Sequence, residues 1–257
     1  MTGAQRGIKI AAIALAIFII FVIISGIFML FGAFSYSDGY DFINTYTNVQ
    51  EVEIDLSSAQ LEIRSGSEFK VQGINVSDRF RVREKEHTIN IDEESFRLFG
   101  GSDSKVIIYV PNYLDELKID SGSGVVSIKD IEVRYLELDQ GAGVIEVDNA
   151  TFDKVEIDGG IGEFTARNSV FSDMELGAGL GEVNIEAKIL GSSKIDSGMG
   201  DVNLTLLGGE ELYEIRLDKG LGDFNINGSK YKYNSYGTGL NKIKIDNGVG
   251  SINIDFK

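Results

Sequence analysis

Apolar and polar positions alternate along residues 117–256 in a pattern that repeats with a pair of glycines. A Gly-x-Gly pair occurs repeatedly: the first five pairs are evenly spaced, and the last two follow after longer intervals. The first glycines of these pairs are Gly122, Gly141, Gly160, Gly179, Gly198, Gly220 and Gly248. A fixed period of about 19 residues is typical of a stacked-repeat architecture.

The columns of the aligned repeats are chemically uniform. Before each pair, at the same offset, stand Ile119, Leu138, Ile157, Leu176, Ile195, Leu217 and Ile245. After each pair, again at one offset, stand Val126, Ile145, Phe164, Val183, Val202, Phe224 and Ile252. Because apolar and polar residues alternate on both sides of the glycines, each repeat predicts two short strands joined by a sharp bend.

A unit of about 19 residues cannot bury its own apolar face, so the units must stack. We therefore predict an all-β fold: a single-stranded parallel β-helix, or solenoid, with about 19 residues per coil. The general bias of parallel crossovers favours a right-handed coil. A β-sandwich is the second interpretation, but it would not require like residues to recur in register.

Residues 1–34 differ from the rest of the chain. Residues 1–9 are short and basic, and residues 10–34 contain no charged side chain. This stretch is long enough to cross a membrane as a helix and longer than the apolar part of a signal peptide. Since Arg6 and Lys9 precede it, we expect a single-pass anchor in the cell membrane, with a cytoplasmic N-terminus and an extracytoplasmic C-terminal domain.

The remaining chain divides into three parts. Residues 35–48 read as a linker, residues 49–116 as an N-terminal coil and cap, and residues 117–257 as the solenoid. The coil at 49–64 is degenerate, with Ser57 and Ala59 in place of the glycines, and residues 68–94 suggest one or two antiparallel hairpins. The last strand, with Ile252, Ile254 and Phe256, is expected to leave an open edge through which the chain could self-associate.

Composition excludes several classes of function. The chain has no Cys and one His, so disulfides and thiolate chemistry are excluded. Its net charge is −16, and without Arg6 and Lys9 the remaining 22 basic and 40 acidic residues give −18. A chain of this charge is not expected to bind nucleic acid, because phosphate binding needs basic clusters.

Three polar columns and one aromatic cluster are the candidate surfaces. Aspartates precede the turns at Asp120, Asp139, Asp158, Asp196, Asp218 and Asp246, with Gly177 interrupting. We expect each to accept backbone N–H groups at its own turn; cations such as Ca²⁺ between rungs are the alternative. The second column is charged, and we expect it to be a solvated face. It consists of Lys118, Glu137, Glu156, Glu175, Lys194, Arg216 and Lys244. The third column, expected to form an amide ladder, contains Asn184, Asn203, Asn225 and Asn253.

The aromatic cluster consists of Tyr213, Tyr231, Tyr233 and Tyr236. The last three lie in a longer interval, which is expected to bulge as a loop, and we expect the rings to pack rather than to form a recognition patch. His87 lies in a charged tip and is expected to be exposed. No paired acid and base, metal triad or activated nucleophile breaks the repeat, so we predict no catalytic, cofactor-binding or metal-binding residue.

The repeat Leu-x-Ile-Asp-x-Gly-x-Gly-x-Val-x-Ile, preceded by the run Val106–Pro111, resembles the bacterial and archaeal "putative adhesin" family of β-solenoid domains of unknown function. The likeness covers about residues 49–256. It implies a secreted or membrane-anchored domain, some members being encoded with envelope-stress regulators, and it carries over no catalytic residue.

The sequence therefore predicts a surface binding or scaffold module, linked to adhesion or envelope sensing, with a cell-surface glycan or an envelope protein as its partner. A self-assembling rod and a polysaccharide-active enzyme are the alternatives. No cofactor is expected.

Overall fold

The computed structural model describes residues 39–93, 104–111 and 113–257, and the predicted anchor lies outside these ranges. No helix of the described residues has the length and apolarity needed to cross a membrane.

Within the described ranges, the elements are all strands except for one short 3₁₀ helix. The elements before the glycine repeats are β1 (Tyr40–Tyr46), β2 (Glu51–Ser65), β3 (Phe69–Val76), β4 (Phe80–Lys85), β5 (Thr88–Glu93) and β6 (Lys105–Val110). The remaining elements are β7 (Tyr113–Lys129), β8 (Glu132–Asp148), β9 (Thr151–Ser172), β10 (Met174–Leu190), β11 (Ser192–Met199), β12 (Val202–Leu206), η1 (Glu210–Leu212), β13 (Tyr213–Leu221), β14 (Phe224–Ile226), β15 (Ser229–Lys230), β16 (Ser235–Tyr236), β17 (Asn241–Val249) and β18 (Ile252–Phe256).

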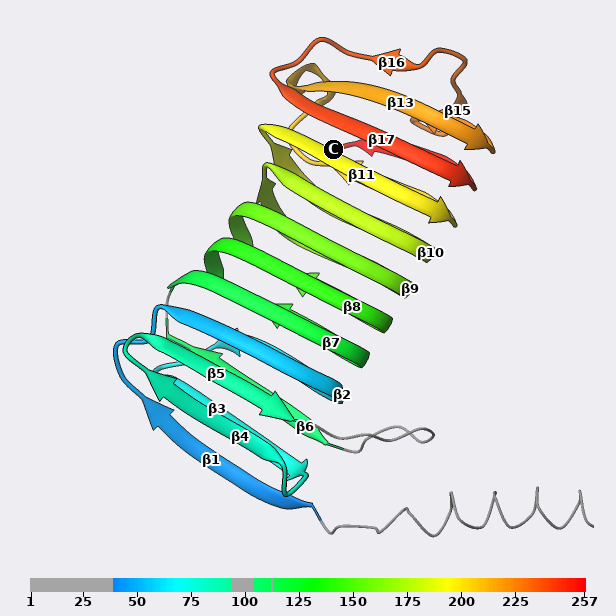
Figure 1. The fold of residues 1–257 in the computed structure, drawn as a ribbon. Coiled ribbons are helices and arrows are strands. Elements are labelled where there is room, and N and C mark those ends of the chain that lie inside the picture. Colours follow the sequence, from blue (N-terminus) through cyan, green and yellow to red (C-terminus); the bar gives the residue numbers. More distant parts are fainter. Residues whose placement is uncertain (1–38, 94–103, 112) are drawn as a thin grey trace, which may run out of the picture. The chain divides into compact units, whose positions relative to one another are not determined.

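Each repeat forms one rung of a parallel stack, as predicted. Strands β7, β8, β9 and β10 pair in parallel along their length, and Figure 1 shows them side by side. Their registers place like residues on like residues: Ile157 pairs with Leu176, and Leu176 with Ile195. The inward columns on both sides of the turn are almost completely buried. One apolar core thus runs through the stack, which is the solenoid-like arrangement expected from the repeat.

The glycine turns allow the rungs to approach closely. Gly181 has φ of 145°, and a Cβ at this position would lie 1.6 Å from the carbonyl oxygen of Gly162 on the neighbouring rung. No side chain fits there, so the second glycine of the pair is required by both conformation and space. In the degenerate coil the equivalent residue is Ala59, which pairs with Gly124 as the sequence predicted.

The opposite turn uses asparagine and aspartate instead of glycine. Asp130, Asn149 and Asn168 have φ near 50°, a conformation that these two residue types tolerate better than others. Asn149 also donates from its amide to the Asp130 carboxylate over 2.6 Å. The sequence carries this signal as a second repeat of turn residues with the same spacing, which the prediction missed.

The N-terminal end does not stack in chain order. The coil at 49–64 was expected to be first, yet β2 lies between β7 on one side and β5 and β6 on the other. The outermost rung of this end therefore comes later in the chain than the rung it covers. The predicted hairpin is present as the antiparallel pair β4–β5, and β3 covers β6 in antiparallel orientation.

The C-terminal end is also out of order, and here the predicted open edge is wrong. Strand β18 pairs in parallel with β12 on one side and with β14 on the other, so Ile252 and Ile254 are internal. Likewise β17 lies between β11 and β13, as Figure 1 shows. The segment expected to bulge as a loop contains β15 and β16, which pair antiparallel with β14 and β13. It therefore covers the last rung instead of leaving it bare.

Candidate functional site

The aspartate column is longer than the repeat alone indicated. The strand registers align Asp92 with Asp55, Asp55 with Asp120, and then the other aspartates rung by rung. In spatial order the column is Asp92, Asp55, Asp120, Asp139, Asp158, Gly177, Asp196, Asp246 and Asp218. The first two members were missed because their rungs lack the glycines that marked the others.

Stacked carboxylates repel one another, and the structure shows the effect at the middle of the column. Desolvation raises the pKa of Asp139, and the charges of Asp158, Glu137 and Asp120 raise it further. The column is interrupted at Gly177, where an added Cβ would lie 2.4 Å from the Oδ1 atom of Asp158. The glycine thus leaves room for the Asp158 carboxylate, and Asp158, Asp196, Asp218 and Asp246 line an open groove around this gap.

The expected backbone bonds to these aspartates are absent at several rungs. Within the described ranges, no backbone N–H donates to Asp139 or Asp158, and Asp196 and Asp246 accept instead from Lys194 and Lys244. Among the described residues, no group of three or more His, Cys, Asp or Glu is placed to hold a metal ion.

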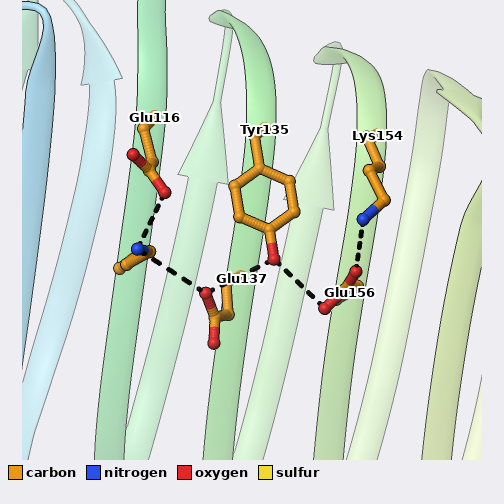
Figure 2. A network of polar contacts seen from close by, with 6 residues as sticks. Glu116, Tyr135, Glu137, Lys154 and Glu156 are labelled. Carbon is orange, nitrogen blue, oxygen red and sulfur yellow. Dashed lines mark hydrogen bonds and ion pairs between the residues drawn. The ribbon is translucent and has the colours of Figure 1, made fainter.

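The mixed charged column forms a network with a tyrosine that the sequence did not single out. Figure 2 shows Tyr135 between two glutamates, with its hydroxyl 3.1 Å from Glu156 and 3.4 Å from Glu137. Lys154 binds Glu156 over 2.6 Å and lies 5.1 Å from the centre of the Tyr135 ring. Desolvation and the bond to Glu156 raise the pKa of Tyr135, which therefore stays protonated and donates to both carboxylates.

The asparagine column forms the predicted amide ladder. Each side-chain amide donates to the next over 2.8–2.9 Å, in the order Asn225, Asn253, Asn203 and Asn184. The ladder ends on the Glu163 carboxylate, 3.4 Å from the Asn184 amide nitrogen. These amides thus bind one another, which leaves them less free to bind a ligand.

An exposed apolar column was missed by the sequence analysis. The middle residue of the Gly-x-Gly pair is large and apolar in five rungs, and these residues pair in the order Ile161, Leu180, Met199, Val249 and Leu221. Their exposed fractions are 59%, 46%, 54%, 42% and 74%, respectively. We call this column the ridge. Its signal was the large apolar middle residue in five of the seven Gly-x-Gly turns, where a polar residue is usual.

Carboxylates flank the ridge on both sides along the chain. The upstream flank consists of Asp158, Asp196, Asp246 and Asp218, and the downstream flank of Glu163, Glu182, Asp201 and Asp223. Lysines pair with Asp196, Asp246 and Asp223. Asp158, Glu163, Glu182 and Asp201 have no lysine or arginine within ion-pair distance among the described side chains. The ridge is therefore an apolar strip between two anionic margins.

Comparison with known proteins identifies the family. The family model described as Toastrack DUF4097 matches residues 49–220. This chain belongs to the Toastrack DUF4097 family. The match agrees with the resemblance drawn from the repeat, and it covers the rungs from β2 to β13.

Three solved structures similar to this Toastrack chain are named as adhesion or lipid-binding proteins. They include a "putative cell adhesion protein" from Clostridium sporogenes, with 17% identity, 85% of this chain and 100% of that chain covered, and a TM-score of 0.37. A "putative adhesin" from Bacteroides fragilis has 11% identity, 84% and 96% coverage, and a TM-score of 0.36. A "putative lipid binding protein" from Parabacteroides distasonis has 11% identity, 85% and 97% coverage, and a TM-score of 0.41. No curated protein matches the chain.

The remaining candidate residues of this Toastrack domain are the four tyrosines and His87. Tyr213 is fully buried, and Tyr231 and Tyr236 pack against the core, as expected, whereas Tyr233 is 71% exposed. The Tyr236 hydroxyl donates to Glu210 over 2.7 Å, which ties the covering segment to η1. His87 is exposed, as predicted, and its Nδ1 atom lies 3.0 Å from the carbonyl oxygen of Asn48.

Proposed function

We propose that this chain is a membrane-anchored, extracytoplasmic Toastrack module that acts by binding an envelope protein, as an adhesin-like or scaffold component of the cell surface. The uncharged run at residues 10–34 supports the anchor, and the positions of Arg6 and Lys9 support the orientation. The net charge of −18 beyond the run favours a domain that stands off anionic headgroups.

The ridge is the observation that carries the binding role. Five large apolar side chains, each more than two-fifths exposed, lie in one unbroken column on the surface. Scattered apolar residues are normal on a protein surface, but a contiguous patch is typical of an interaction site. Burial of apolar surface is the main favourable contribution to most protein–protein association, which favours an envelope protein over a glycan as partner.

A cysteine-labelling experiment tests the topology. The chain has no cysteine, so Leu180→Cys provides a single label on the ridge, and Thr2→Cys provides one before the uncharged run. We expect a membrane-impermeant maleimide to label position 180 in intact cells, and position 2 only after permeabilisation. Labelling of position 2 alone in intact cells would reject the proposed orientation.

An adhesion experiment tests the binding role. Cells that display the full chain are applied to immobilised envelopes isolated from the same organism, and cells that lack the chain are the control. We expect the displaying cells to be retained at least several-fold better. Equal retention of both kinds of cell would reject the proposal.

A further inference from the structure

We infer that the ridge and its two acidic flanks form a docking surface for a basic amphipathic helix of a partner protein. This inference rests on the proposed binding function and specifies the partner. It is carried by three observations on the described residues: the apolar column, the carboxylates on both sides of it, and the spacing of the rungs.

The spacing favours a helix over an extended strand. Five rungs about 4.8 Å apart give a ridge on the order of 19 Å long. A helix presents one apolar position per turn of about 5.4 Å, so four turns match the five side chains with a small drift. Alternate residues of an extended strand lie about 6.7 Å apart, and such a strand would fall out of step after two rungs.

The charges select a basic helix. Asp158 on the upstream flank has no lysine or arginine within ion-pair distance among the side chains that the structure describes, and neither have Glu163, Glu182 and Asp201 downstream. Lysine or arginine side chains on both borders of an apolar helix face would therefore meet carboxylates on both sides. Complementary charges of this kind fix orientation and speed association.

The same charges disfavour the other occupants of the surface. A second copy of this chain would bring its own acidic flanks against these carboxylates, and like charges facing each other cost affinity. An anionic membrane surface would be repelled for the same reason. A neutral apolar segment would cover the ridge but partly desolvate the flanking carboxylates without bringing a cation to them.

The test uses the full chain in nanodiscs of zwitterionic lipid and synthetic 18-residue peptides. The first peptide is an amphipathic helix with leucine on one face and lysine on both borders. The second carries glutamate in place of lysine, and the third has the composition of the first in an order that leaves no apolar face. Binding is measured by fluorescence anisotropy, and binding to empty nanodiscs is subtracted.

Matched variants locate the binding on the ridge. The ridge variant is Leu180→Ser with Met199→Ser, and the control is Ile43→Ser with Leu240→Ser, which removes two apolar side chains that are 66% and 93% exposed and lie off the ridge. We expect the lysine peptide to bind the wild type and the control equally and the ridge variant at least tenfold more weakly. Glu163→Gln with Glu182→Gln should weaken binding several-fold and reduce its salt dependence.

Three outcomes would overturn the inference. One is equal binding of the lysine peptide to the wild type and the ridge variant, and another is binding of the glutamate or reordered peptide as tight as that of the lysine peptide. The third is a concentration-dependent dimer of the wild type that the ridge variant loses, which would assign the ridge to a second copy. In each case, the adhesion experiment still tests the proposed binding function separately. If cells that display the chain are retained on envelopes, the binding function stands although the helix-docking inference fails.

Discussion

At the scale of single residues, the glycine turn is the most constrained feature of the chain. We predict that Gly181→Ala destabilises the domain by at least about 1–2 kcal/mol, because alanine at positive φ is strained and its Cβ would meet a backbone oxygen. Gly159→Ala is the matched control, since its Cβ would have its nearest neighbour at 3.6 Å. Urea unfolding measures both, and an equal effect of the two substitutions would contradict the close approach of the rungs.

The aspartate column makes a pH-dependent prediction. Because the pKa of Asp139 is raised in the folded state, its protonated form stabilises the fold, and this stabilisation is lost as the pH rises through the raised pKa. Asp139→Asn should therefore stabilise the domain at pH 7, and its advantage should shrink below the ordinary aspartate range near 3.9.

The control for this prediction is Asp255→Asn, because Asp255 pairs with Thr205 and lies outside the column. Thermal unfolding at several pH values measures both variants against the wild type. A loss of stability in Asp139→Asn at pH 7 would show that the column does not repel in the way described.

At the scale of single elements, the asparagine ladder joins neighbouring strands on the outer face. Asn203 donates to Asn184 and to the Glu182 carboxylate and accepts from Asn253, so Asn203→Ala breaks the ladder in the middle and removes three hydrogen bonds. We expect a loss of about 1–2 kcal/mol, and about half of that for Asn225→Ala, which removes one bond at the end of the ladder. Chemical denaturation checks the order of the two effects; a larger loss at Asn225 would contradict it.

Elements that repeat could be predicted from the sequence, and elements that break the repeat could not. Columns such as Ile157, Leu176 and Ile195 fixed the parallel register, because a shift of one residue would turn the apolar side chains outward. The ridge was missed because a turn residue such as Leu180 belongs to neither strand pattern. The Tyr135 network was missed because Tyr135 lies on one rung alone and its partners come from two.

At the scale of the whole described stack, the rungs at both ends are out of chain order. At the N-terminal end, β5 and β6 lie outside the earlier strand β2, and at the C-terminal end β17 lies between β11 and β13. The alternation of apolar and polar residues along one strand cannot reveal the order of the rungs. Ile245, for example, is equally suited to pair with Leu217 and with Ile195, and in the structure it pairs with both. The last strand, β18, pairs with a neighbour on each side, which explains why it does not form the expected open edge. The structure of a single rung could therefore be predicted from the sequence, but the order of the terminal rungs could not.

Removal of residues 241–257 tests how far the last two strands support their neighbours. Ile243, Ile245, Ile252 and Ile254 are buried, so the deletion should cost on the order of 6 kcal/mol or more. Hydrogen exchange should show that the amides of β13 lose protection, because β13 loses its parallel partner, while those of β8 keep theirs. Full protection of β13 in the shortened chain would contradict the inserted position of β17.

The most direct test of the account is the order of the ridge, since the proposed surface exists only if Val249 lies between Met199 and Leu221. Two double variants of the cysteine-free chain decide it: Met199→Cys with Val249→Cys, and Met199→Cys with Leu221→Cys. Adjacent rungs about 4.8 Å apart suit a disulfide, whereas rungs about 9.6 Å apart do not. Under mild oxidation, mass spectrometry should find the 199–249 crosslink and not the 199–221 crosslink; the reverse result would contradict the stack and the surface built on it.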